Sequence, residues 1–416
     1  TVVGDAKAVL SMLLEEVMKS YVKGEETGGY FTFAVFGDNR PRNKLSAILL
    51  GQPREFKELI KELSIIRPDF AVVVGDLIYG YGEGYGVLKL EYSRFNSTIS
   101  CGIPIVTVVG NHDTKTEDLP ESGDPIAEML YKMYFGMLYY SFEYKGSHFF
   151  ILDTDIVGCA GGITGEQLEW LRREAALARG NKFAFMHRPV VTLEGFDTGW
   201  NFDPGELIEL FEENNFTAVF QGHNHIFYRE EVGGVMYFVT GGAGAPLFAS
   251  RWRGAVHHFL LVEVNGSRVR VSFLPIPALE ISYSKSSRGE EITITARIKY
   301  LFSSPMEFEF GKVEPSPVPL RGVKFELPAD YKVTEVRGGE LILTCSRGDK
   351  VVAYVATVIQ PGEVKEVSIK AKPSEDGCGI AHALVGPASR RPGSQFLLEG
   401  PPLQKVARKP PTSVGG

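Results

Sequence analysis

Residues 70–79 read FAVVVGDLIY, and this stretch decides the fold. A nearly continuous apolar run rich in valine is typical of a strand buried on both faces inside a parallel sheet. Gly75 then lets the backbone turn tightly, and Asp76 carries a carboxylate just beyond the strand. In open α/β sheets, ligands bind outside the carboxyl ends of the strands. The stretch therefore predicts an interior strand that delivers a functional carboxylate into a cleft.

Four further segments carry polar side chains directly after an apolar run. They are Gly37-Asp38-Asn39-Arg40, Gly110-Asn111-His112-Asp113, Met186-His187-Arg188-Pro189 and Gly222-His223-Asn224-His225. Carboxylate, amide oxygen and imidazole are hard or borderline metal ligands. Because all these segments follow predicted strands, we expect their side chains to gather around one cleft. Such an arrangement can hold two metal ions and activate a water between them.

The first two thirds of the chain alternate between apolar runs and amphipathic stretches. This alternation predicts an α/β fold with some antiparallel strands late in the domain, over residues 28–275. We expect helices at residues 56–66 and 167–177 and a hairpin formed by residues 139–144 and 148–152. The other predicted strands are residues 30–36, 70–74, 105–109, 182–186, 217–220, 235–239 and 256–264.

The pattern changes near Pro275-Ile276-Pro277, after which helical periodicity disappears. Short strands at regular spacing predict a small β-sandwich over residues 276–385. These strands are residues 291–300, 306–310, 323–327, 340–344, 350–359 and 363–369. Residues 386–416, rich in proline, glycine and basic residues, predict an extended tail, and residues 1–27 are expected to contain a leading amphipathic helix at residues 6–23.

Composition excludes some classes of protein. The chain has 416 residues and a net charge of -7, which argues against a general nucleic-acid binder. No apolar run approaches the ~20 residues that span a bilayer, so we expect no transmembrane segment. The sequence begins with Thr1, as a processed or trimmed chain does, and we expect an extracellular or cell-surface location, with a cytoplasmic one left open.

The four cysteines do not have the paired spacing of a zinc motif. Cys101 could pair with Cys159, and Cys345 with Cys378. The alternative is that all four remain free or buried thiols.

Several candidate ligands have a plain structural alternative. Asp38 alone could cap a turn, and Tyr79 could either pack its ring in a glycine-rich loop or give a phenolate ligand to a trivalent ion. The His-x-His spacing of His223 and His225 sets two imidazoles on one side of an extended segment. Four of the eight histidines lie in these strand-end motifs, which makes a purely structural role for the whole set improbable.

The order of motifs resembles the calcineurin-like metallophosphoesterase superfamily between about residues 30 and 275. Three motifs look like its purple acid phosphatase branch, which has a tyrosine three residues after the bridging aspartate: Gly75-Asp76-Leu77-Ile78-Tyr79, Met186-His187-Arg188-Pro189 and Gly222-His223-Asn224-His225. The resemblance implies a four-layer α/β/β/α sandwich. Asp113 stands where the protein serine/threonine phosphatases of the superfamily carry glutamate, so the resemblance to that branch is weaker.

The resemblance also implies a role for each position. Asp38, Tyr79 and His225 would bind the first metal, Asn111, His187 and His223 the second, and Asp76 would bridge the two. His112 would donate a proton to the leaving oxygen, and we expect Asp113 to orient the His112 imidazole. Arg40 departs from the pattern, because it stands where the superfamily often has a histidine ligand. It either leaves the first metal short of a ligand or faces the substrate phosphate.

These expectations point to a metal-dependent phosphoester hydrolase with iron, manganese or zinc in a dinuclear centre. A phosphomonoesterase acting on small-molecule phosphoesters is the main expectation, and a phosphodiesterase or nucleotidase is the alternative. A non-catalytic, metal-stabilised surface protein is a third possibility, against which the presence of His112 argues. The C-terminal β domain could contact a surface or partner, and the loops at residues 79–85 and 240–246 and around Trp200 could select the substrate.

Overall fold

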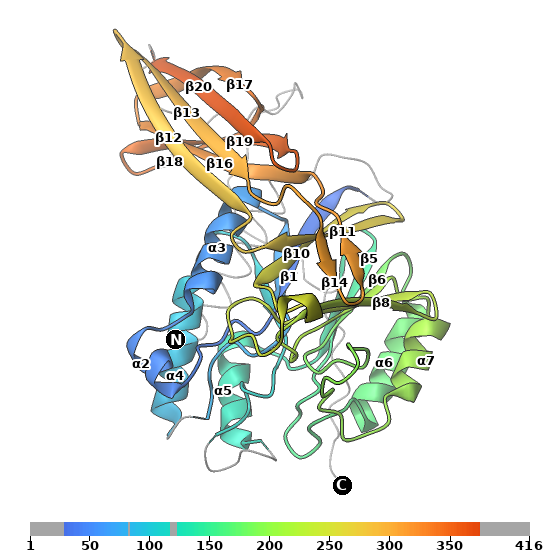
Figure 1. Cartoon of the computed structure of the whole chain (residues 1–416). Coiled ribbons are helices and arrows are strands. Elements are labelled where there is room, and N and C mark those ends of the chain that lie inside the picture. Colours follow the sequence, from blue (N-terminus) through green and yellow to red (C-terminus); the bar gives the residue numbers. More distant parts are fainter. Residues whose placement is uncertain (1–28, 82–83, 117–122, 375–416) are drawn as a thin grey trace, which may run out of the picture.

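The computed structural model describes residues 29–81, 84–116 and 123–374. Two mixed sheets occupy the centre of the first domain (Figure 1). The first sheet has the order β11-β10-β1-β2-β3, formed by β1 (Phe31–Phe36), β2 (Phe70–Val73), β3 (Ile105–Thr107), β10 (His258–Asn265) and β11 (Arg268–Pro275). The second has the order β4-β5-β6-β7-β9-β8, formed by β4 (Tyr140–Tyr144), β5 (Ser147–Ile151), β6 (Lys182–Phe185), β7 (Ala218–Gln221), β8 (Phe227–Val232) and β9 (Val235–Thr240).

Each sheet combines a group of parallel strands with antiparallel strands: the first has them on one side only, and the second has one at each edge. β1, β2 and β3 run parallel, as do β5, β6, β7 and β9. The antiparallel partners β10, β11, β4 and β8 lie outside these groups. Because the parallel strands of each sheet point the same way, the loops that follow them emerge at one edge.

Phenylalanine rings fill the space between the two sheets. Phe33 of the first sheet lies 5.2 Å from Phe183 and 5.4 Å from Phe149 of the second, measured between ring centroids. Both contacts are edge-to-face, the arrangement that aromatic pairs prefer. The period-two alternation of each strand turns these rings inward and leaves the other face of each sheet for helices.

Helices cover the outer faces, which gives the expected four-layer α/β/β/α sandwich (Figure 1). On the first sheet, Phe56 packs against Phe36 with 5.9 Å between ring centroids, and the Tyr131 hydroxyl donates to Thr107 Oγ1 over 2.8 Å. The helices on this side are α2 (Lys44–Leu49), α3 (Arg54–Ile66), α4 (Tyr85–Thr98) and α5 (Pro125–Phe135). The second sheet is covered by α6 (Gly165–Leu177) and α7 (Gly205–Glu213).

The C-terminal region is β-rich, as predicted. It contains two antiparallel sheets, one of order β12-β13-β20-β17 and one of order β16-β19-β18. Their strands are β12 (Leu279–Arg288), β13 (Glu291–Tyr300), β16 (Val318–Pro328), β17 (Tyr331–Arg337), β18 (Glu340–Arg347), β19 (Lys350–Ile359) and β20 (Val364–Pro373). A small hairpin of β14 (Met306–Phe308) and β15 (Gly311–Val313) returns to the first domain, where Phe308 packs on Phe227 with 5.8 Å between ring centroids.

The two domains meet at the carboxyl end of α3. Glu62 Oε1 accepts hydrogen bonds from the backbone of Ala278 and Leu279, at 2.7 and 3.1 Å. Arg321 of β16 pairs with Asp69 at 2.6 Å, and both side chains are largely buried. A Cβ on Gly322 would lie 2.0 Å from the Ser64 carbonyl oxygen, so glycine is required for β16 to approach the helix this closely.

Some predictions fall outside the described residues, namely the leading helix at residues 6–23, the tail at residues 386–416 and Cys378. Within the described ranges, Cys101, Cys159 and Cys345 are free thiols, so Cys101 and Cys159 do not pair in this structure. In the same ranges, no helix combines the length and apolar character needed to cross a membrane.

Candidate metal centre

The predicted motifs meet at one edge of the two sheets. Asp38, Asp76 and Asn111 follow β1, β2 and β3 of the first sheet, whereas His187 follows β6 and His223 and His225 follow β7 of the second. Three of these residues have left-handed backbone conformations, with φ of 56° at Asp38, 57° at Asp76 and 69° at His223. Such conformations are uncommon outside glycine and cluster where function over-determines the backbone.

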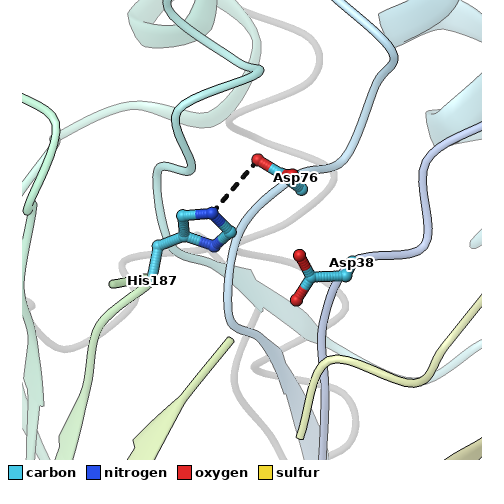
Figure 2. A group of neighbouring side chains, drawn as sticks. All are labelled: Asp38, Asp76 and His187. Atoms are coloured by element: carbon cyan, nitrogen blue, oxygen red, sulfur yellow. Dashed lines mark ion pairs between the residues drawn. The ribbon is translucent and has the colours of Figure 1, made fainter. Parts of the chain in front are cut away.

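Asp38, Asp76 and His187 form the middle of the site. One ligand atom from each lies within 4.8 Å of the other two, and all three side chains are buried. Figure 2 shows the three side chains turned toward one another, with His187 Nε2 3.3 Å from Asp76 Oδ1. His187 Nδ1 donates to the Val74 carbonyl over 2.9 Å, which leaves Nε2 of the neutral ring as a lone-pair donor facing the carboxylate.

A second group of acceptors lies on the His187 side. Asn111 Oδ1 is 3.0 Å from His187 Nε2 and 3.0 Å from His223 Nδ1, and these two nitrogens are 3.3 Å apart. One proton on His223 Nδ1 would have to be shared between Asn111 Oδ1 and His187 Nε2. A cation among the three atoms would satisfy all of them at once, so these residues fit a metal ion.

The Asp38 side has the same mismatch. His225 Nδ1 donates to the Pro246 carbonyl over 2.6 Å, so Nε2 faces Asp38 Oδ1 at 3.4 Å with its lone pair. Asp38 Oδ1 is buried and has no hydrogen-bond partner in the described structure, whereas Oδ2 accepts from the His223 backbone over 2.9 Å. A cation between His225 Nε2 and Asp38 Oδ1 would contact both atoms, and a ligand atom of Asp76 lies within 4.8 Å of one from Asp38.

Arg40 lies beside Asp76 in the site. Its Nε lies 3.2 Å from Asp76 Oδ2, and both side chains are buried. Burial by itself would raise the pKa of Asp76, but His112, His187 and Arg40 hold it well below its usual range. Arg40 thus brings a permanent positive charge where the superfamily often has a ligand.

His112 is held by two backbone contacts. Its Nδ1 donates to the Tyr79 carbonyl, and its backbone N–H donates to Asp76 Oδ1 over 3.1 Å. The other ring nitrogen, Nε2, lies 3.8 Å from Asp76 Oδ2. Burial lowers the pKa of His112 to about 4, although the negative charge of Asp76 acts in the opposite direction. A further negative charge beside the ring, such as a bound phosphate, would raise it.

Asp113 does not orient the imidazole, contrary to the sequence-based expectation. Its carboxylate accepts three backbone N–H groups, from Gly110 at 2.8 Å, Asp76 at 3.0 Å and Leu77 at 3.1 Å. The backbone turn after β3 directs the side chain beneath the loop instead of alongside the His112 ring. Asp113 therefore ties together the two loops that carry Asp76 and Asn111.

Two tyrosines lie near the site. The ring of Tyr79 is 6.3 Å from that of Tyr81 and 5.9 Å from that of His112, measured between centroids. The Tyr81 hydroxyl, by contrast, is hydrogen-bonded to the Asn111 side chain, and burial followed by the charge of Asp76 raises the pKa of Tyr81. A ligand role for Tyr79 stays a prediction, and Tyr81 is the tyrosine that contacts a candidate ligand.

Helix α4 supplies support that sequence reasoning missed. Glu91 Oε2 accepts from the Gly80 backbone over 3.2 Å, and the neighbouring Tyr92 hydroxyl donates to the Asp113 carbonyl over 2.8 Å. Both side chains are buried. One turn of α4 thereby fixes the loop that holds the His112 ring and the loop that carries His112 itself. The only sequence signal for this support would have been an acid next to a tyrosine on the apolar face of a predicted helix.

A cavity of about 230 Å³ opens beside these residues. Its lining residues are Arg40, Asp76, Asn111, His112, Phe196, His223, Asn224, His225, Ile226 and Phe248. Six of the ten predicted site residues, together with Asn224 of the same motif as His223 and His225, thus line a space large enough for a small ligand. Phe196, Ile226 and Phe248 were not singled out from the sequence.

Comparisons with known proteins agree with the motif order. The calcineurin-like phosphoesterase family model matches residues 31–227. The bovine protein named serine/threonine-protein phosphatase CPPED1 is 30% identical over 173 residues, covering 38% of this chain and 54% of that relative. The chain therefore spans about half the length of this curated relative. The relative is named as a serine/threonine phosphatase, and Asp113 makes the resemblance of this chain to the protein serine/threonine phosphatases the weaker one.

Solved structures with similar folds include a purple acid phosphatase from yellow lupin (Lupinus luteus), with a TM-score of 0.48, 18% identity and coverage of 59% of this chain and 52% of that one. Another is GAP50 of Plasmodium, described as the anchor in the inner membrane complex, with a TM-score of 0.45, 15% identity and coverage of 60% and 85%. At these identities the likeness concerns the fold alone.

Proposed function

We propose that this chain, which belongs through residues 31–227 to the calcineurin-like phosphoesterase family, hydrolyses phosphate esters at a dinuclear metal centre. The observation that carries the proposal is the convergence of buried lone-pair donors from both sheets. They form two groups of closely spaced nitrogen and oxygen atoms beside Asp76, each of which a bound cation would satisfy. Two bound ions would supply Lewis acidity and a hydroxide at neutral pH.

The chain's own residues then have distinct tasks. Asp38 and His225 would hold one ion, Asn111, His187 and His223 the other, and Asp76 would contact both. Tyr79 remains a candidate ligand for the first ion, and iron, manganese or zinc would each suit such a donor set. A tyrosinate ligand would favour iron(III), which an absorption band in the visible range would reveal.

Arg40 and His112 would act on the substrate. Both line the cavity and flank Asp76 Oδ2, at 3.2 and 3.8 Å. The Arg40 guanidinium would bind the non-bridging phosphate oxygens. His112 Nε2 faces the same space, and the phosphate dianion would raise the pKa of the ring so that it can carry a proton to the leaving oxygen.

A monoester is the substrate that these features favour. The cavity is small, at about 230 Å³, and the Arg40 charge complements a terminal dianion better than a diester monoanion. A phosphodiesterase or nucleotidase is the alternative. The net charge of -7 supports a small-molecule substrate over general nucleic-acid binding.

The test is metal-dependent hydrolysis by the full chain. The metal-free protein would be loaded in turn with Mn²⁺, Zn²⁺ or Fe, and assayed with p-nitrophenyl phosphate, bis-p-nitrophenyl phosphate and nucleotides. We expect the monoester to be preferred and His112→Ala to lower turnover with unchanged metal content. Absence of metal-dependent hydrolysis with every ester would refute the proposal and favour a non-catalytic, metal-stabilised protein.

A further inference from the structure

The cavity beside the candidate metal centre has two kinds of wall. Its polar lining includes Arg40, His112 and His223. The rest of the lining includes two phenylalanines, Phe196 and Phe248. A phosphate group can use only the polar part, because its oxygens need charge or hydrogen bonds. The aromatic part therefore needs another occupant.

Phe248 is unusually exposed for a phenylalanine. The residue is 78% exposed to solvent. Its ring nevertheless stacks on the His225 ring, with 5.2 Å between centroids and an interplanar angle of 27°. One face of the phenyl ring thus rests on a candidate metal ligand while much of the residue remains in water. An apolar ring left in water at the rim of a polar cavity is a favourable contact for a ligand that covers it.

The loop that carries Phe248 is fixed on both sides. Before it, the Ala245 N–H donates to the Asp38 carbonyl over 2.7 Å, and the Pro246 carbonyl accepts from His225. After it, the short helix η1 (Arg251–Arg253) is tied to the β14–β15 hairpin, because the Glu309 N–H donates to the Trp252 carbonyl over 2.8 Å. The exposed ring is therefore presented by an ordered loop, which lowers the entropic cost of binding against it.

Phe196 is held in place from behind. The Arg253 guanidinium carbon lies 4.9 Å from its ring centroid, and Arg253 Nε pairs with Glu309 at 3.1 Å. A cation over an aromatic face fixes the ring without covering its other side. The two phenylalanines thus border the same cavity, and both are anchored through the short helix η1 and Glu309.

We infer that the preferred substrate is a phosphate monoester whose leaving group carries a flat apolar ring, joined to the ester oxygen directly or through one carbon. The ring lies against Phe248 and Phe196 while the phosphate lies against Arg40. The short link follows from the cavity, which at about 230 Å³ includes both the aromatic and the charged residues in its lining. This inference rests on the proposed phosphoester hydrolysis and names the substrate class for the same site.

The experiment compares benzyl phosphate with ethyl phosphate on the metal-loaded full chain. Both esters release a primary alcohol, so the comparison tests ring recognition with similar leaving groups. Cyclohexylmethyl phosphate separates a flat ring from a bulky apolar group. We expect kcat/KM for benzyl phosphate to exceed that for ethyl phosphate by about 10-fold or more, since an aromatic contact adds to the burial of apolar surface.

Substitutions at the rim locate the effect. Phe248→Ala should reduce the benzyl-to-ethyl ratio by about 3- to 10-fold, and Phe248→Leu by less, since leucine keeps apolar surface but not the ring. Trp252→Ala is the matched control, because Trp252 is also exposed, at 54%, and lies in the same region but outside the cavity lining. It should leave the ratio unchanged.

A binding measurement keeps the inference separate from turnover. Calorimetry would compare benzylphosphonate with methylphosphonate, neither of which can be hydrolysed at a P–O–C bond. Tighter binding of benzylphosphonate that Phe248→Ala removes supports the inference. Equal binding of the two probes, or a wild-type kcat/KM ratio near one, overturns it. If no ester is hydrolysed, the hydrolase proposal fails, and the phosphonate pair alone then decides whether the rim takes a ring.

Discussion

Arg40 should oppose one of the two metal ions of the proposed dinuclear centre. Asp76 Oδ1 is the oxygen turned toward His187, so Oδ2 is the oxygen left for an ion on the Asp38 side. Arg40 Nε already holds Oδ2 at 3.2 Å, in a buried ion pair. An ion that takes this oxygen must displace or share a charge-assisted hydrogen bond.

The size of the effect follows from that single contact. A hydrogen bond to a charged group contributes about 1.5–3 kcal/mol, and every ~1.4 kcal/mol changes a dissociation constant tenfold. Removal of Arg40 should therefore tighten the weaker metal site by about 10- to 100-fold. Repulsion between the guanidinium and the ion acts in the same direction. The site formed by Asn111, His187 and His223 should change much less.

The assay is calorimetric titration of the metal-free full chain with Mn²⁺ or Zn²⁺. Arg40→Met removes the charge and keeps an unbranched side chain, whereas Arg40→Lys keeps a charge and serves as the control. We expect two classes of site in the wild type, of which only the weaker tightens in Arg40→Met. Activity should nevertheless fall, because the phosphate loses its cation. Unchanged metal affinities in both classes of site would show that Arg40 does not compete with a metal. Higher turnover in Arg40→Met would show that Arg40 does not bind the phosphate.

Three more predictions follow from contacts away from the cavity. Glu91→Ala removes the acceptor for the Gly80 N–H and should lower kcat with unchanged metal content, while Glu91→Gln keeps an acceptor and should restore most of the activity; equal turnover in all three proteins would exclude a positioning role. Gly222→Ala would bring a Cβ within 2.6 Å of the Val74 carbonyl oxygen and 2.7 Å of Asp38 Oδ2, so elemental analysis should find less bound metal than in Gly86→Ala, whose Cβ meets nothing within 4 Å. Burial raises the pKa of Glu62 from 4.5 to about 8, so the folded state favours the neutral acid. The stability that the neutral Glu62 contributes is complete below the pKa of the unfolded chain and is lost as the pH rises toward 8. Between about pH 5 and pH 8, Glu62→Gln should therefore lose less stability than the wild type, by up to a few kcal/mol at ~1.4 kcal/mol per pKa unit. Thermal unfolding that shifts equally with pH in the two proteins would contradict this.

The strands that carry the candidate ligands could be predicted because burial on both faces leaves a strong sequence signal. β1, β2 and β6 are buried along their whole length and differ from their predictions by one residue each, at Tyr30, Val74 and Met186. β12 could not be predicted, because most of its residues are exposed and its sequence ISYSKSS has little apolar alternation. It forms through a continuous ladder with β13 that pairs Leu279 with Tyr300 and Arg288 with Glu291. Tertiary pairing, not local pattern, makes it a strand.

Helices near the site were harder to predict for a related reason. α4 contains Gly86, Ser93 and Asn96, which weaken helix propensity and blur its apolar face. Its buried residues include Glu91, whose place in the interior depends on the Gly80 N–H of a distant loop. The role expected of Asp113 failed similarly, since adjacency to His112 in sequence does not fix the direction of its side chain. Sequence identifies which residue types gather, but backbone direction decides what each one contacts.

The division of the candidate ligands between the sheets links metal binding to the stability of the whole first domain. Asp38, Asp76 and Asn111 come from one sheet, and His187, His223 and His225 from the other, so the site exists only while the two sheets are packed. That packing depends on rings such as Phe33 and Phe183 between the layers. An ion that binds only the packed state stabilises it by RT ln(1 + [M]/Kd), about 2.7 kcal/mol at a hundredfold excess over Kd. The buried nitrogen and oxygen atoms that a metal would bind are the same atoms that destabilise the domain when no metal is present. Removal of metal should therefore lower the midpoint of thermal unfolding for both sheets together.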